Sequence, residues 1–185
     1  DIATKTKEDI YKVVIAVEEM AKSRTGALIV FERDIKIQDI IETGIKLDAE
    51  ISPQVLVNIF VPKTPLHDGA AIISNNKIIA AACILPLADD KDIAKELGTR
   101  HRAAIGISKE SDAIAVVVSE ETGKVSIAKD GTLIADVKED ALKRILIKNL
   151  VTARFGSEKK TNGLTKMKEK ISAKKSKKQE NQEIK

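Results

Sequence analysis

The first 60 residues alternate between helical and strand-like patterns of hydrophobic positions. In residues 7–22 the apolar side chains recur every three or four positions, which predicts an amphipathic helix that ends near Gly26. Residues 27–31 form a short apolar run rich in β-formers, which is typical of a strand buried on both faces. A helical spacing returns over 35–44, and Ser52, followed by a proline, is a typical N-cap of a further helix.

From residue 70 onward, short apolar runs predict several strands and two more helices. The expected strands are 70–73, 77–85, 113–118, 125–128 and 133–137, and the expected helices are 100–108 and 139–150. Asn75 and Asn76 separate the first two strands and are typical of a tight hairpin turn. Strands mixed with helices through short connections predict a single α/β domain, with a mixed central β-sheet flanked by helices in three layers.

The composition narrows the class of protein. A chain of 185 residues with 43% hydrophobic and 32% charged residues is typical of a soluble globular domain. It has no apolar run of membrane-spanning length and no signal-peptide pattern. The single cysteine, Cys83, excludes an intramolecular disulfide and is typical of a reducing cytoplasm. With only three Phe, one Tyr and no Trp, the chain lacks a base-stacking platform, so we expect no nucleic acid as partner.

The formal net charge of +4 is unevenly distributed along the chain. Residues 157–185 contain ten lysines and four glutamates, a balance of +6, so residues 1–156 carry a balance of −2. The end segment has few large apolar residues, which predicts a Lys-rich disordered tail after a domain at 1–156. Such a tail could act as an electrostatic tether to anionic lipid or nucleic acid. We favour a solvated tail, because composition alone specifies no partner.

Three polar clusters interrupt the apolar pattern, and the first is Thr-Pro-Leu-His-Asp-Gly-Ala at 64–70. A loop of this kind can present the carboxylate of Asp68 to a ligand or metal, while Gly69 allows close backbone approach. The alternative is a turn in which Asp68 caps its own backbone. The local string alone favours that alternative.

The second cluster is Gly-Thr-Arg-His-Arg-Ala-Ala at 98–104, at the expected start of a helix. Backbone amides, the positive end of the helix dipole and guanidinium groups suit phosphate oxygens. The alternative is an ordinary helix start with Thr99 as the cap and surface ion pairs for the arginines. Because Arg100 and Arg102 in a first turn oppose the helix dipole, an anionic partner explains them better.

The third cluster is Val-Ser-Glu-Glu-Thr-Gly at 118–123, where a strand ends in a hydroxyl and two carboxylates. Strand ends in α/β sheets are common ligand sites, but the string also fits an exposed β-turn, and the pattern does not choose between them. A zinc site formed by His67, His101 and Cys83 is a rival use of the polar residues. Cys83 lies within an apolar strand, so we expect it in the core.

Taken together, the three clusters resemble the diadenylate cyclase family, whose hallmarks are a DGA and an RHR motif. Those motifs stand here at 68–70 and 100–102, and 26–32 and 84–87 also look like the family. The resemblance covers about residues 7–150. Relatives often have a tyrosine at the position of Ile84, where it stacks on adenine, so the base would lie against aliphatic groups here.

The resemblance implies a metal-dependent nucleotidyltransferase that condenses two ATP into cyclic di-3′,5′-AMP and two pyrophosphates in a face-to-face homodimer. The implied catalytic residues are Asp68, Gly69, Arg100 and Arg102. The implied ATP contacts are Leu28, Asp68, Gly69, Ala70, Leu85, Gly98, Thr99, Arg100, His101, Arg102, Ser119 and Glu120. The implied ligands of a divalent metal (Mn²⁺ or Mg²⁺, with Co²⁺ as a third option) are His67, Asp68 and Glu121.

Each implied residue has a role suited to its chemistry. Asp68 would bind the metal or help to activate the 3′-hydroxyl, and Thr99, Arg100 and Arg102 would hold the triphosphate. Leu28 and Leu85 would line the adenine slot.

Within the family, the chain looks most like the membrane-anchored bacterial cyclase, which predicts a cytoplasmic domain of a cell-membrane protein with its anchor upstream of Asp1. Two alternatives remain open. The same clefts could hold a nucleotide without turnover, in a regulatory or nucleic-acid-binding module that the Lys-rich tail would support. A structural scaffold would bind no nucleotide at all.

Overall fold

The computed structural model of the protein describes residues 1–89 and 97–153. The predicted tail at 157–185 and its boundary with the domain lie outside the described residues. The helices are α1 (Ile2–Ser23), α2 (Gln38–Glu42), α3 (Pro53–Ile59), α4 (Thr99–Glu110), α5 (Glu139–Ile147) and a π-helical continuation, η1 (Lys148–Thr152). The strands are β1 (Ala27–Phe31), β2 (Ile45–Glu50), β3 (Ala70–Ser74), β4 (Lys77–Cys83), β5 (Ile114–Val118), β6 (Val125–Lys129) and β7 (Thr132–Ile134).

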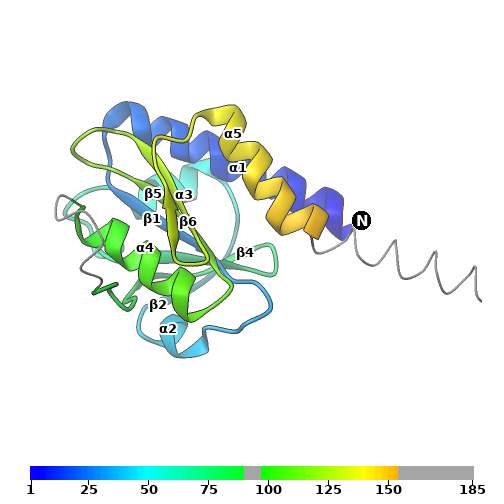
Figure 1. Ribbon diagram of the computed structural model, residues 1–185, viewed down its shortest axis with the longest axis horizontal. Helices are drawn as coiled ribbons and strands as arrows, with labels where there is room; N and C mark the ends of the chain where they lie inside the picture. The colour runs from blue at the N-terminus through cyan, green and yellow to red at the C-terminus, as the bar shows by residue number, and fades with distance from the viewer. Residues whose placement is uncertain (90–96, 154–185) are drawn as a thin grey trace, which may run out of the picture.

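The seven strands form one mixed sheet in the order β2-β4-β3-β1-β5-β6-β7. β1 and β3 run parallel, and the other neighbouring strands run antiparallel. Helices α1, α3 and α5 pack on one face, and α4 and α2 pack on the other (Figure 1). The predicted α/β domain with a mixed central sheet and three layers is confirmed.

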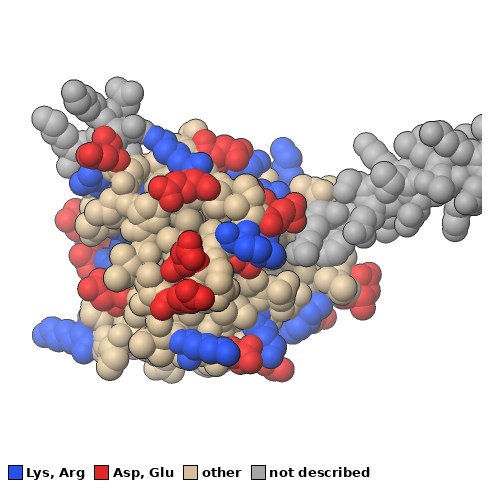
Figure 2. All heavy atoms as spheres, turned by 90° about the horizontal axis from the view of Figure 1, so that it is seen from below, with Lys and Arg blue, Asp and Glu red and all other residues tan. Residues whose placement is uncertain are grey.

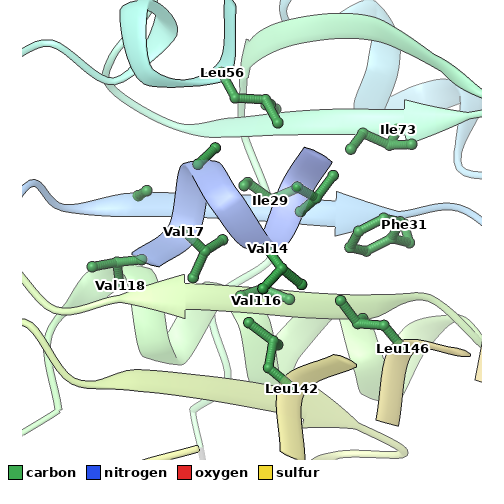
Figure 3. Packing of buried hydrophobic residues seen from close by; sticks show 14 of the residues in the cluster. Val14, Val17, Ile29, Phe31, Leu56, Ile73, Val116, Val118, Leu142 and Leu146 are labelled. Atoms are coloured by element: carbon green, nitrogen blue, oxygen red, sulfur yellow. The ribbon is translucent and has the colours of Figure 1, made fainter. Parts of the chain in front are cut away.

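The core is divided between the two faces of β1, because successive side chains of a strand point to opposite faces. Ile29 and Phe31 pack against α1, while Leu28 and Val30 pack on the side of α4. Figure 3 shows the first of these layers, with side chains of α1 and α5 pointing toward the sheet. Burying an aliphatic side chain of this size contributes about 1.5–3 kcal/mol.

Helix α1 is longer than the predicted 7–22, because Asp1 caps its start. The Asp1 carboxylate accepts a hydrogen bond from the backbone N–H of Ala3 at 3.0 Å, and Arg24 ends the helix in a left-handed conformation at φ 51°. Its buried stripe matches the predicted one. No helix in the described part of the chain is both long enough and apolar enough to cross a membrane.

The edge strand β2 was not predicted from the sequence, and the helix before it is shorter than predicted. The helix predicted at 35–44 is limited to α2, because a loop precedes it in which the Asp112 carboxylate accepts the backbone N–H groups of Asp34 and Ile35 at 3.0 Å. Strand β2 is interrupted by a register shift against β4 and has no fully buried residue, so its hydrophobic signal is weak. Both differences arise from contacts distant in sequence.

The remaining elements agree with the prediction apart from their ends. The hairpin between β3 and β4 turns at Asn75 and Asn76, whose φ angles of 50° and 62° are the left-handed values that a tight hairpin requires. The strand predicted at 133–137 is the shorter β7, and the helix predicted at 139–150 continues as η1.

Candidate functional site

The register of the sheet brings the three polar clusters to one end of the molecule. Ala27 of β1 pairs with Val118 of β5, and Ala70 of β3 pairs with Cys83 of β4. The Asp-Gly turn before β3, the turn after β5 and the segment after β4 therefore lie at the same sheet end. The first turn of α4 lies there too, because it shares a cavity with the Asp-Gly turn.

This cavity, which we call the α4 cavity, has a volume of about 330 Å³, within the usual range of small-ligand pockets. Its lining is apolar on one part and polar on another: Leu28, Cys83, Ile84, Leu85, Leu87 and Ala103, with Asp68, Gly69, Thr99 and Arg100. Leu28 and Leu85 are buried, whereas Ile84 and Leu87 are 70% and 49% exposed. The cavity suits a ligand with an apolar part and an anionic part.

The Asp-Gly turn presents a carboxylate at the cavity. Gly69 has φ +104°, and a Cβ at this position would lie 2.7 Å from the Cys83 carbonyl oxygen, so only glycine fits the turn against β4. Strand β4 of the protein itself therefore requires a glycine at this position, because its backbone lies too close for a side chain. Asp68 is exposed, and its side chain has no hydrogen bond or ion pair within residues 1–89 and 97–153. Among these residues, Asp68 therefore does not cap its own turn.

The N-terminus of α4 presents hydrogen-bond donors to the cavity. The N-cap is Gly98 and not Thr99, and a glycine has no side chain with which to cap the helix. The backbone N–H groups of the first turn, where the helix dipole is positive, therefore donate to no capping side chain at Gly98. Arg100 is three-quarters buried, and the part of the chain that the structure describes offers its Nε no partner. Its Nη1 lies 3.5 Å from Glu120 Oε2, an exposed carboxylate. These are the donors that an anion would engage.

Gly26, just before β1, makes room for that arginine. A Cβ at Gly26 would overlap the guanidinium group of Arg100. From the sequence, Gly26 was predicted to mark the end of the first helix and to belong to the 26–32 motif, with no role toward Arg100. A hydrophobicity pattern cannot reveal this contact, because Gly26 and Arg100 are far apart in sequence.

Two other members of the Arg-His-Arg motif are placed differently from Arg100. Arg102 does not line the cavity; its Nε and Nη2 both donate to the Ala88 carbonyl oxygen at 3.2 Å. The half-buried His101 has a pKa below its usual 6.5, because burial and the nearby Arg100 charge disfavour protonation, with Glu121 acting in the opposite direction. His101 is therefore neutral near pH 7.

The third cluster lies beside the cavity and does not line it. The Ser119 hydroxyl accepts the backbone N–H groups of Glu121 and Thr122 at 3.3 Å, so it stabilises its own turn. Glu120 reaches the site through its ion pair with Arg100. Ala70 and Gly98 are likewise adjacent to the cavity and absent from its lining. Three lining residues had no predicted contact role: Cys83, Leu87 and Ala103.

The predicted metal ligands do not come together as a three-residue cluster in the described part of the chain. His67 Nδ1 lies 2.7 Å from the Thr64 carbonyl oxygen, and of His67, Asp68 and Glu121 only Asp68 lines the cavity. The rival zinc set of His67, His101 and Cys83 does not cluster either. The buried Cys83 has a pKa raised to about 11 by burial, which disfavours the thiolate that zinc requires.

Comparison with known proteins agrees with the site. A family model described as DisA bacterial checkpoint controller nucleotide-binding (DAC) matches residues 14–133. The chain is 56% identical over 142 residues to the cyclic di-AMP synthase CdaA of Bacillus subtilis, covering 77% of this chain and 51% of that protein. It is 59% identical over 133 residues to a diadenylate cyclase of Listeria monocytogenes, covering 72% of this chain and 49% of that protein.

A solved structure agrees with the fold as well. A double mutant of DacA from Staphylococcus aureus has a TM-score of 0.76 and 52% identity, with coverage of 77% of this chain and 95% of that chain. The chain spans about half the length of the curated relatives it matches. The family model matches more than half of the residues, and the fold is shared with a solved relative. The chain therefore belongs to the DAC family, the diadenylate cyclases.

Proposed function

We propose that this chain is the catalytic domain of a diadenylate cyclase, which condenses two ATP into cyclic di-3′,5′-AMP and two pyrophosphates. The observation that carries the proposal is the α4 cavity, where a carboxylate that no described residue engages, the donors of a helix N-terminus and an apolar slot meet. An adenine nucleotide needs an apolar contact for its base and donors for its phosphates. The relatives named as cyclic di-AMP synthase and diadenylate cyclase support the same reaction.

In the proposed reaction, the 3′-hydroxyl oxygen of each ATP attacks the α-phosphorus of the other. Two new P–O bonds form, two bonds to pyrophosphate break, and each hydroxyl proton is released. Leu28 and Leu85 contact the base, and Thr99 with Arg100 contacts the triphosphate. Since this chemistry depends on position and charge neutralisation, Arg100 stabilises the charge that develops on the phosphate. His101 and Ser119 support the flanking turns, and Glu120 orients Arg100.

A divalent cation, Mn²⁺ or Mg²⁺, would neutralise phosphate charge and lower the pKa of the attacking hydroxyl. Asp68 is the residue that would hold it. A single carboxylate suits such an ion, because Mg²⁺ in nucleotide sites takes one or two carboxylates, waters and the substrate phosphates. The absence of a three-ligand cluster among the described residues therefore fits a cation that arrives with ATP.

We further propose that catalysis takes place between two protomers related by a two-fold axis, each holding one ATP. Each cavity binds one nucleotide, whereas the product ring joins two. The exposed Ile84 and Leu87 at the cavity mouth are apolar surface that a partner protomer would cover. The rate per subunit should then fall with dilution. A concentration-independent rate from a strict monomer would contradict the two-protomer reaction.

We place the domain in the cytoplasm next to a membrane. A similar solved structure from Bacillus cereus, 46% identical with a TM-score of 0.66, is named as a hypothetical membrane spanning protein.

In Figure 2, acidic and basic side chains are interspersed on the visible face and form no continuous basic patch there. That distribution gives no support to nucleic-acid binding through this face.

The proposal is tested by incubating the chain with ATP and either Mn²⁺ or Mg²⁺ and separating the products by chromatography. Cyclic di-AMP and pyrophosphate in a one-to-two ratio are expected. ATP binding without any cyclic product would instead identify a non-catalytic nucleotide-binding module. No binding of ATP would leave only a structural role.

A further inference from the structure

The segment 84–88 forms one wall of the α4 cavity and is held at both of its ends. Leu85 and Leu87 line the cavity from this segment. At its start, the backbone N–H of Ile84 donates to the Thr43 hydroxyl at 2.9 Å. At its end, the backbone N–H of Ala88 donates to the Arg102 carbonyl oxygen at 3.1 Å. The wall is therefore attached to α2 on one side and to α4 on the other.

The attachment to α4 uses the side chain of Arg102 as well as its backbone. Nε and Nη2 of Arg102 both donate to the Ala88 carbonyl oxygen at 3.2 Å, so the planar guanidinium binds one acceptor through two donors. The carboxylate of the fully exposed Asp89 lies 3.9 Å from Arg102 Nη2, and such a surface ion pair contributes little. The guanidinium of Arg102 is therefore committed to a backbone carbonyl.

The backbones of α4 and of the wall also touch directly. A Cβ at Gly106, one turn further along α4, would overlap the Pro86 carbonyl oxygen and would lie 3.1 Å from the Ala88 nitrogen. Only glycine permits this approach. Arg102 and Gly106 thus fix the wall from two adjacent turns of one helix.

On the basis of the function proposed above, we propose that Arg102 is a positioning residue for the base: it holds the 84–88 wall in place, and Arg100 contacts the phosphates. The two arginines of the motif have the same charge, but only Arg100 lines the cavity and has a buried nitrogen without a partner among the described residues. Loss of Arg102 loosens the contact of Leu85 and Leu87 with the base. Loss of Arg100 removes a phosphate donor.

The test measures binding of three competitors against a fluorescent ATP analogue in the full chain: adenosine, inorganic tripolyphosphate and ATP. For Arg102→Ala, we expect the affinities for adenosine and ATP to fall by a similar factor, about tenfold, with tripolyphosphate nearly unchanged. The matched variant Arg100→Ala should show the opposite pattern, with tripolyphosphate and ATP weakened and adenosine spared. Thermal unfolding of each variant checks that it is folded.

A second variant tests the same wall without changing any charge. Gly106→Ala pushes against Pro86 and leaves Arg102 intact, so it should weaken adenosine and ATP and spare tripolyphosphate. Arg102→Lys keeps the charge but replaces the two-donor grip, and it should behave like Arg102→Ala toward adenosine.

The positioning role is wrong if Arg102→Ala weakens tripolyphosphate as much as ATP while adenosine binding is kept. It is also wrong if all three affinities stay unchanged. Because these measurements record binding, they are separate from turnover: a chain that forms no cyclic di-AMP but shows the predicted pattern would contradict only the proposed reaction.

Discussion

Two cavities of equal volume, about 330 Å³ each, lie at opposite ends of the sheet, and their polar groups are used differently. The second, which we call the α1 cavity, lies where β1 and β3 end and is lined by parts of α1, the hairpin and η1. Several of its polar side chains pair with one another: the Ser74 hydroxyl donates to Glu32 at 2.7 Å, and the Asn76 amide donates to Asp9 at 2.9 Å. Lys5 pairs with the same Asp9 at 3.1 Å.

In the α4 cavity, the Nε of Arg100 is buried and has no partner among the described residues, and the exposed Asp68 carboxylate has none there either. Buried polar groups in folded proteins are nearly always hydrogen-bonded, so an unpaired one calls for a ligand or another special role. Cavity volume alone would rank the two places equally. What distinguishes the α4 cavity is the combination that lines it: a carboxylate, an arginine with a buried nitrogen that no described residue engages, and the N-terminus of a helix.

The largest expected effect comes from removing one charge in the α4 cavity. Asp68→Asn keeps the shape of the side chain but removes its charge, so cyclic di-AMP formation should fall by roughly 10²–10³-fold while the fold survives. Asp34→Asn is the matched control, because Asp34 is a carboxylate that lines the α1 cavity. Chromatography of the product measures both. Equal losses in the two variants would end the distinction between the cavities.

The second largest effect is expected from filling the space that Gly26 leaves for the Arg100 guanidinium. Gly26→Ala places a methyl group where the guanidinium lies, so the rate should fall by up to roughly a hundredfold through misplacement of one phosphate contact. Because the loss acts through Arg100, the double variant with Arg100→Ala should be no slower than Arg100→Ala alone. Losses that simply multiply would show that Gly26 acts by another route.

A smaller effect is expected in the α1 cavity, on stability and not on rate. Ser74→Ala leaves one oxygen of the buried Glu32 carboxylate without its donor, which should lower the free energy of unfolding by about 1–3 kcal/mol. Ser23→Ala removes an exposed hydroxyl that hydrogen-bonds to Glu19, Met20 and Thr25 at the end of α1, and because water can replace these partners the loss should be smaller. Urea denaturation measures both. A Ser74→Ala protein of normal stability but reduced turnover would place function in the α1 cavity.

The smallest effect is the pH dependence that His101 contributes. Its pKa is lowered in the folded chain, so the unfolded chain binds its proton at a higher pH. The corresponding stability is present above about pH 6.5 and is lost as the pH falls through the lowered pKa. The free energy of unfolding should therefore decline less between about pH 7.5 and about pH 5.5 in His101→Gln than in the wild type. Parallel declines would exclude His101 as the source.

The sequence by itself predicted the elements whose signal is local. Buried strands such as 27–31 are continuous apolar runs, and the helices are periodic, so β1 and α1 could be predicted from their own residues. The motifs around Asp68 and Arg100 could also be found, because turn and helix-start chemistry requires particular residues in a short stretch. Those residues indicate the family and the kind of ligand.

Only the tertiary structure decided which members of these motifs face the cavity. Arg100 and Arg102 are two positions apart on α4, and residues with that spacing do not share a helix face, so one lines the cavity while the other grips Ala88. The edge strand β2 and the space at Gly26 are likewise set by partners distant in sequence. The physical reason is common to all three: a side chain's role depends on what the fold packs against it, and the local sequence does not contain those neighbours.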